Sequence, residues 1–206
     1  SDNKVTIPST LGGYTVTEIA AEAFADRKRV QSVTIPSTVT TVGDKAFYNC
    51  NSLRTITLPN SVTKLGTHVF ELGVRWTQVT LPAGITAIPE GTFRDCEALN
   101  RYTTPSGVKT IGNTAFRYCK ALSSLTIPAG VTSIGADAFA GCEKLTTLDL
   151  PDSLRTIGEN AFANCVAIKR IKLPSQLTAV SDGMFQYCGA LTTITLPDSV
   201  TSVGAN

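Results

Sequence analysis

All eight phenylalanines of this 206-residue chain are spaced 23 residues apart. They are Phe24, Phe47, Phe70, Phe93, Phe116, Phe139, Phe162 and Phe185. Spacing this regular indicates an array of 23-residue repeats, in which each unit contacts only its neighbours. Because such an array presents a long continuous face and rarely encloses one deep pocket, the repeat favours a binding or structural module over an enzyme.

Each repeat follows the pattern LxxIxLPxxVxxIGxxAFxxCxx, as in the unit that begins at Leu145. The Ile-x-Leu alternation predicts a strand with one buried face, and the proline ends that strand because it lacks a backbone donor. The Val-x-x-Ile spacing predicts a second extended stretch, and the glycine after it predicts a sharp turn at positive φ. The Ala-Phe-x-x-Cys segment is too short for a stable helix, so it predicts one helical or 3₁₀ turn with Phe and Cys pointing inward.

Stacking of these units determines the predicted fold. One unit cannot bury its apolar face alone, whereas stacked units bury it in a continuous core. We expect a single α/β but strand-dominated solenoid over residues 1–206, with a parallel sheet on one face and short helical or 3₁₀ turns between the extended segments. Residues 1–30 form an atypical first unit with a five-residue insertion, residues 31–206 are regular repeats, and the last unit is truncated. The crossover rule for parallel strands predicts a right-handed path.

These motifs resemble the BspA-like, or Treponema-type, leucine-rich repeat family across essentially the whole chain. The shared features are Leu-x-x-Ile-x-Leu-Pro at the start of the unit and Ile-Gly-x-x-Ala-Phe-x-x-Cys at its end. The first unit departs from the pattern, because Arg27 stands where the Cys is expected. The resemblance implies a right-handed leucine-rich-repeat superhelix in an extracellular or cell-surface bacterial protein, and an adhesin that binds host matrix or plasma proteins. This implication about function is an analogy, since a fold does not determine function.

Net charge and hydropathy exclude some classes of binding partner. The formal net charge is +2, which gives no concentrated basic patch for nucleic acid or an anionic membrane. No apolar run approaches the roughly 20 residues of a transmembrane helix, so we expect no membrane insertion. The only methionine is Met184, and we therefore expect the chain to be a fragment or mature segment of a longer protein.

The cysteines share one position of the repeat. They are Cys50, Cys96, Cys119, Cys142, Cys165 and Cys188. Their spacing differs from the clustered ligands of zinc sites, so we expect no metal site. Stacked equivalent side chains have Cβ atoms about 4.8 Å apart, beyond the mean near 3.8 Å in disulfides. We therefore expect buried free thiols that act as small hydrophobes, with occasional bridges as the alternative.

No catalytic or cofactor constellation is visible in the sequence. His68 is the only histidine, and neither a Ser-His-Asp set nor a Cys-His set can be assembled around it. The recurring glycine is a turn residue rather than a phosphate-binding loop. We therefore expect no enzymatic activity and no cofactor.

The repeat is violated most strongly in its third and fourth units. Gly73 replaces Cys, Trp76 replaces Leu, Pro89 replaces Gly, Tyr102 replaces Ile and Thr104 replaces Leu. One interpretation is compensation, in which the indole fills the space that the missing Cys side chain leaves. The other is that Trp76 or Tyr102 points outward in a recognition patch, because both residue types favour interfaces.

The solvent-facing row of the predicted sheet is mostly threonine, with a few charges. The residues that flank the central Ile point away from the core, and at Lys169-Arg170-Ile171-Lys172 they are basic. Lys172 and Asp149 occupy the same row on adjacent strands, where they could pair. Arg170 has no partner in its row, and Arg101 shares that row three strands away. These charges are either ordinary solvated residues or a patch for an acidic partner.

The sequence therefore predicts an extracellular recognition module of a bacterial surface adhesin, which binds a host protein or a glycan. The candidate partner-binding residues are Trp76, Arg101, Tyr102, Arg170 and Lys172. Two alternatives stay open. The array is a passive stalk or spacer, which the uniformity of the threonine row favours, or it is an accessory module of a larger surface enzyme.

Overall fold

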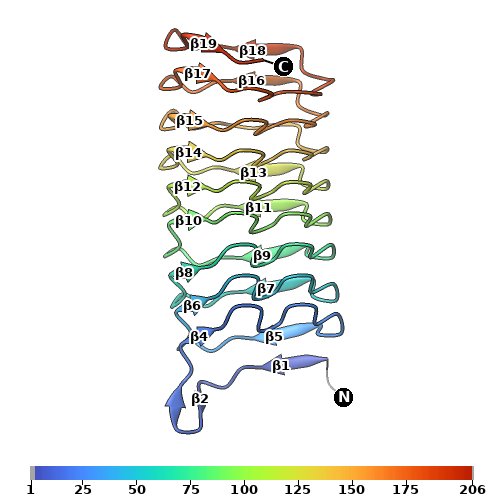
Figure 1. Ribbon diagram of the computed structural model, residues 1–206, viewed down its shortest axis with the longest axis vertical. Coiled ribbons are helices and arrows are strands. Elements are labelled where there is room, and N and C mark those ends of the chain that lie inside the picture. The colour runs from blue at the N-terminus through green and yellow to red at the C-terminus, as the bar shows by residue number, and fades with distance from the viewer. Residues whose placement is uncertain (1–2, 206) are drawn as a thin grey trace.

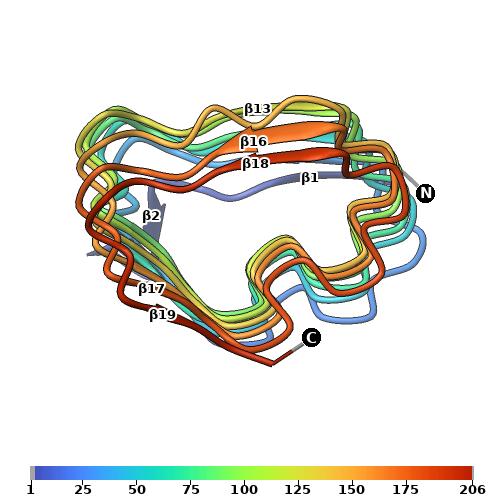
Figure 2. The same ribbon diagram turned by 90° about the horizontal axis from the view of Figure 1, so that it is seen from above.

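The computed structural model describes residues 3–205 as a stack of coils, each made by one 23-residue repeat (Figure 1). Each coil contains two short extended segments and one turn segment that carries the phenylalanine. Seen along the stack, the equivalent segments of the coils lie over one another around a common interior (Figure 2). The fold is a strand-dominated, parallel β-solenoid.

The Ile-x-Leu segments form the first strand ladder, as the sequence predicts. Its strands are β1 (Lys4–Thr6), β5 (Ser32–Thr34), β7 (Thr55–Thr57), β9 (Gln78–Thr80), β11 (Arg101–Thr103), β13 (Ser124–Thr126), β16 (Arg170–Lys172) and β18 (Thr193–Thr195). They pair in parallel as β1–β5, β7–β9, β11–β13 and β16–β18, and residues 147–149 form no strand. The first ladder is therefore a series of separate pairs rather than one continuous sheet.

The Val-x-x-Ile segments form the second strand ladder. Its strands are β4 (Glu18–Ile19), β6 (Thr41–Val42), β8 (Lys64–Leu65), β10 (Ala87–Ile88), β12 (Thr110–Ile111), β14 (Ser133–Ile134), β15 (Thr156–Ile157), β17 (Ala179–Val180) and β19 (Ser202–Val203). They form three parallel sheets in the orders β4-β6-β8, β10-β12-β14-β15 and β17-β19. This ladder is interrupted only between β8 and β10 and between β15 and β17, within residues 3–205.

The glycine after the second extended segment serves close packing between coils. The prediction of positive φ at this position is wrong, because the described glycines of this column are absent from the positive-φ residues. A Cβ added to Gly43 would lie 2.5 Å from the backbone nitrogen of Ala21, and one added to Gly66 would lie 2.5 Å from that of Asp44. Any larger side chain would therefore push adjacent coils apart.

The two interruptions of the second ladder fall where this glycine is replaced. Gly66 donates its N–H to the Val42 carbonyl of the preceding coil at 2.8 Å. Pro89 stands at the equivalent position after β10 and has no N–H to donate. Ser181 stands there after β17, and its side-chain oxygen donates to the Ile157 carbonyl instead. The substitutions thus account for the missing strand pairing at both places.

The Ala-Phe-x-x-Cys segment is not helical, and the predicted α/β class is wrong in this respect. Residues 3–205 contain no α-helix or 3₁₀ helix. Successive N–H groups alternate in direction: Phe47 donates to the Val69 carbonyl of the next coil at 2.9 Å, and Tyr48 donates back to the Lys45 carbonyl at 3.0 Å. A helix is excluded because half of the donors point along the stack and because Lys45 and Asn49 have φ values of 54° and 53°.

This turn ladder continues through the whole described stack. Three N–H groups of each turn donate to the turn of the next coil, from Glu22, Phe24 and Asp26 at the first step to Asn160, Phe162 and Asn164 at the seventh. Inside it, the eight Phe rings stack at centroid separations of 5.0 to 5.8 Å. The turn segments, rather than the strands, join all the coils.

The insertion near the N-terminus forms an antiparallel hairpin that leaves the stack below β4 (Figure 1). Its strands are β2 (Thr10–Leu11) and β3 (Tyr14–Thr15), and Gly12 and Gly13 occupy the turn at φ values of 59° and 84°. Leu11 and Tyr14 are exposed. No helix in the described part of the chain is long and apolar enough to cross a membrane.

Candidate recognition surface

The outer face of the first ladder is exposed, as predicted. In β7, β9, β11, β13 and β16 the central residue is buried and the two flanking residues are exposed. Half of these exposed residues are threonine, and the others include Arg101, Arg170 and Lys172. The structure therefore places three of the predicted partner-binding residues on one accessible face.

An open groove crosses this face between residues 146–150 and β16. We call it the Arg170 groove. It has a volume of about 720 Å³ and is lined by both of these segments and by Thr193 and Thr195 of β18. Its size lies within the roughly 300–1,000 Å³ of typical ligand sites. The groove and the Ser181 interruption occupy the same gap between two coils, at successive segments of the chain.

The groove exposes unpaired main-chain groups. In a parallel strand, alternate residues direct their N–H and C=O groups toward opposite neighbours. The Lys169 carbonyl and the Leu173 N–H bond to the coil of β18, so Arg170 and Lys172 direct theirs into the groove. No backbone hydrogen bond joins β16 to residues 146–150 within the described chain. The groove is therefore bounded by a strand edge that has free donors and acceptors.

The charges of the groove are unequal along its length. Lys169 and Arg170 lie at the end that faces Thr146 and Thr147, whereas Lys172 lies at the end that faces Asp149. The predicted pairing of Lys172 with Asp149 is wrong, because no ion pair within 4.0 Å joins them in the structure. Residues 147–149 form no strand and do not pair with β16.

A second, smaller groove lies between β9 and β11. Its volume is about 370 Å³, and Arg101 lies at its edge. The N–H and C=O groups of Arg101 and Thr103 face this groove, because the Asn100 carbonyl and the Thr104 N–H bond toward β13. The column of the repeat that contains Arg101 and Arg170 has no other arginine. Each arginine of the column thus lines one of the two grooves.

Trp76 and Tyr102 do not belong to this surface. Trp76 is fully buried, and its indole occupies the space that a Cβ at Gly73 would enter. Tyr102 is 5% exposed and packs between the rings of Phe93 and Phe116, at 4.8 and 5.1 Å. Outward recognition roles for Trp76 and Tyr102 are therefore wrong, and the compensation interpretation of Trp76 is confirmed. The Trp76 Nε1 and the Tyr102 hydroxyl have no hydrogen-bond partner, and burial raises the pKa of Tyr102.

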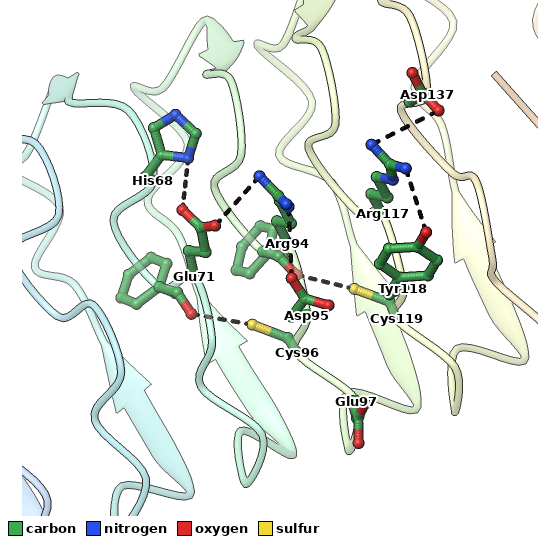
Figure 3. Close-up of polar contacts among 12 residues, drawn as sticks. His68, Glu71, Arg94, Asp95, Cys96, Glu97, Arg117, Tyr118, Cys119 and Asp137 are labelled. Carbon is green, nitrogen blue, oxygen red and sulfur yellow. Dashed lines mark hydrogen bonds and ion pairs between the residues drawn. The ribbon is translucent and has the colours of Figure 1, made fainter. Parts of the chain in front are cut away.

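A charged network on the turn ladder was not predicted (Figure 3). His68 Nδ1 lies 2.7 Å from Glu71 Oε2, and Arg94 Nη1 of the next coil lies 3.5 Å from Glu71 Oε1. Arg94 Nε also lies 3.4 Å from Asp95 Oδ2. The sequence signal was present, since His68 precedes Glu71 by three residues and Arg94 follows it by one full repeat. Glu71 is only 8% exposed, and Arg94 of the next coil lies against its carboxylate. The network therefore connects two coils.

The cysteines lie inside the turn ladder as free thiols, as predicted. Five are buried and Cys188 is half-buried. Each donates through Sγ to the Phe carbonyl 26 residues earlier, as Cys96 does to Phe70 at 3.1 Å and Cys119 to Phe93 at 3.1 Å (Figure 3). Loss of solvation raises the pKa of Cys50 to about 11 and raises those of the other five thiols as well. The thiols are therefore protonated packing groups at neutral pH.

The two ladders, the turn segments and the 23-residue coil together define a leucine-rich-repeat solenoid. The chain belongs to the BspA type leucine-rich repeat family, whose repeat region matches residues 17–122 and 109–206. No curated protein matches the chain.

Two solved structures with the same fold are similar to the chain. One is a leucine-rich cell surface protein from Faecalibacterium prausnitzii, at 27% identity and a TM-score of 0.63 over 93% of this chain. The other is the leucine-rich repeat protein of T. pallidum, at 27% identity and a TM-score of 0.56 over 98% of this chain. The chain spans 59% of the F. prausnitzii protein and 73% of the T. pallidum protein.

Proposed function

We propose that this chain is a protein-recognition module of a bacterial cell-surface protein, and that it binds its partner through the outer face of the first strand ladder. The observation that carries the proposal is that basic residues line the two grooves of that face. Arg101 lies at one groove, and Arg170 and Lys172 lie at the other. The family and the cell-surface protein from F. prausnitzii support an extracellular setting.

The partner is a host matrix or plasma protein that presents acidic residues. The exposed guanidinium of Arg170 has no ion pair within the described chain, so its charge is available to a carboxylate. Binding relies on many modest contacts along an extended face, and display of several copies on a cell would multiply them. No step in this function requires catalysis or a cofactor.

A passive spacer is the second candidate function. It is favoured by the turn ladder, whose hydrogen bonds and Phe stack run without interruption from coil to coil. Such a continuous element suits a stiff stalk. A spacer requires no binding face, so the two candidates differ in whether substitutions at the grooves change any interaction.

Binding to a panel of fibronectin, fibrinogen, other matrix proteins and glycans at physiological salt tests the proposal. We expect saturable binding to at least one protein, and Arg170→Ala/Lys172→Ala should weaken it about tenfold or more. The matched control is Lys109→Ala/Arg155→Ala, which removes two exposed positive charges beside the second ladder. Absence of binding across the panel would favour the spacer, and equal losses in the two variants would show that binding depends on net charge rather than on the Arg170 groove.

A further inference from the structure

The Arg170 groove brings charges of both signs together without pairing them. The wall formed by residues 169–172 carries Lys169, Arg170 and Lys172, and the opposite wall carries Asp149 and Asp152. All five residues are exposed, and none of them forms an ion pair within 4.0 Å in residues 3–205. Both the positive and the negative charges of the groove are therefore available to a partner.

The two signs of charge are separated along the length of the groove. Equivalent residues of the two walls are one repeat apart and face each other as Arg170 with Thr147, Lys172 with Asp149, and Ser175 with Asp152. The last pair is joined, because the Ser175 N–H donates to Asp152 Oδ1 at 3.2 Å. The groove is thus positive at Arg170, balanced at Lys172 and negative at Asp152. Arg170 and Ser175 are five residues apart, so at most about 18 Å separates the two ends.

The floor of the groove is closed, so a ligand lies on the outer face of the solenoid. Leu148 is 5% exposed and Ile171 is 4% exposed. The rings of Phe139 and Phe162, which precede the two walls in the chain, stack at 5.6 Å. The two coils are packed against each other, and an occupant therefore covers the exposed charges from outside rather than entering between the coils.

We infer that the groove binds a dipolar loop of the partner protein, with an acidic side chain at Arg170 and a basic side chain at Asp152. The inference rests on the proposed function and specifies the chemistry of the segment that is recognised. A bound partner removes water from the charges of both walls, and a charge that loses water without gaining a counter-charge weakens binding. A loop that covers the whole groove must therefore supply both signs of charge.

Ligands that carry a single sign of charge complement only one end of the groove. A uniformly acidic loop or a sulfated glycan is attracted by Arg170, but Asp149 and Asp152 repel it. Repulsion of this kind distinguishes between partners that share the attractive contact. Asp149 and Asp152 therefore determine specificity, because they select a dipolar loop over a polyanion.

Neutralising the two carboxylates gives a test whose sign separates these partners. Asp149→Asn/Asp152→Asn removes the negative charges and keeps a side-chain acceptor for the Ser175 N–H. It should weaken binding of a panel protein that carries a dipolar loop about tenfold, whereas it should strengthen binding of a uniformly acidic partner. The matched control is Glu143→Gln/Glu159→Gln, which neutralises two exposed carboxylates outside the groove and should leave binding unchanged. Unchanged or stronger binding to the Asn variant would overturn the inference.

A displayed library of disulfide-closed random loops, selected on the immobilised protein, tests the inference without a known partner. We expect enrichment of loops that contain both an acidic and a basic residue. Selection on Arg170→Ala/Lys172→Ala should lose the preference for the acidic residue, and selection on Asp149→Asn/Asp152→Asn should lose the preference for the basic one. Enrichment of uniformly acidic loops, or no enrichment, would contradict a dipolar ligand.

The two proposals fail under different outcomes. If a panel protein binds through Arg170 and binds more tightly to Asp149→Asn/Asp152→Asn, the recognition function stands and the dipolar-loop inference falls. If dipolar loops are enriched while no panel protein binds, the specificity of the groove stands and the host protein proposed as the partner falls.

Discussion

The turn ladder and the two strand ladders are built from the same repeats, but they tolerate sequence change differently. In the turn ladder, each coil donates three hydrogen bonds to the next, and every Phe position is occupied. In the strand ladders, pairing stops at Pro89 and Ser181 in the second ladder and after every pair of strands in the first. The turns therefore join the coils. Because the strands are not needed for this, their pairing and their exposed residues can differ from coil to coil.

The largest expected effect comes from breaking the Phe stack in its middle. Phe116→Ala should lower the free energy of unfolding by about 4 kcal/mol, because the ring is fully buried between Phe93 and Phe139. Phe185 is half-buried and stacks on Phe162. Phe185→Ala should therefore cost less than half as much in urea unfolding. Equal losses for the two variants would contradict a stack that joins all coils.

The second test introduces a side chain between two coils that the second ladder joins. A Cβ at Gly135 would lie 2.5 Å from the backbone nitrogen of Asn113, so Gly135→Ala should cost about 3 kcal/mol. Gly84→Ala is the matched control, since its Cβ would meet the Thr63 methyl at an ordinary 3.4 Å. Both changes are measured by urea unfolding. A Gly135→Ala variant as stable as the control would refute the role of close packing in the glycine column.

A double-mutant cycle tests the compensation in the third unit. Trp76→Leu alone should leave a cavity, and Gly73→Cys alone should clash with the indole, so each should destabilise the fold. The double variant restores the residues of the repeat. Its loss of unfolding free energy should be about 2 kcal/mol smaller than the sum of the losses of the two single variants. Additive losses in thermal or urea unfolding would mean that the two sites are not coupled.

The thiols of the turn ladder predict a smaller, pH-dependent effect. Burial raises the pKa values of these thiols in the folded state above 9.0. Their contribution to the free energy of unfolding is therefore complete at neutral pH, and it is lost as the pH rises from 9.0 through the pKa of the folded state. Each thiol should contribute a slope of up to about 1.4 kcal/mol per pH unit in this window. The unfolding free energy of Cys142→Ala should therefore fall less steeply than that of the unmodified protein between pH 9 and 10. Identical slopes would show that this thiol is not buried.

Particular residues show which parts of the fold could be predicted from the sequence. The period-2 alternation correctly predicted the exposed rows and the strands except at residues 147–149, which form no strand, and the 23-residue spacing correctly predicted the inward Phe and Cys. The turn segment was predicted incorrectly because nothing in the sequence indicates positive φ at residues such as Lys45 or Thr114. The function of the glycine column depends on the distance between coils, which one repeat in isolation does not reveal.

The grooves were only partly predictable. Arg101 and Arg170 could be placed on the exposed row, but their association with openings depends on which strands fail to pair. For the Arg170 groove, the replacement of glycine by Ser181 was the available signal, and it becomes interpretable only once the close approach at the other glycines is known. Trp76 and Tyr102 were ambiguous in the sequence because large aromatic residues serve both cores and interfaces.

Amide hydrogen exchange, resolved by residue in the free protein, tests the comparison of the two regions most directly. The account predicts slow exchange at Phe47, Phe93 and Phe139, whose N–H groups belong to the turn ladder, and fast exchange at Arg101, Arg170 and Lys172, whose N–H groups face the grooves. Ile171, which faces β18, should be protected and serves as the control within the same strand. Equal protection of Arg170, Ile171 and Lys172 would show that the first ladder is continuous and would contradict the account.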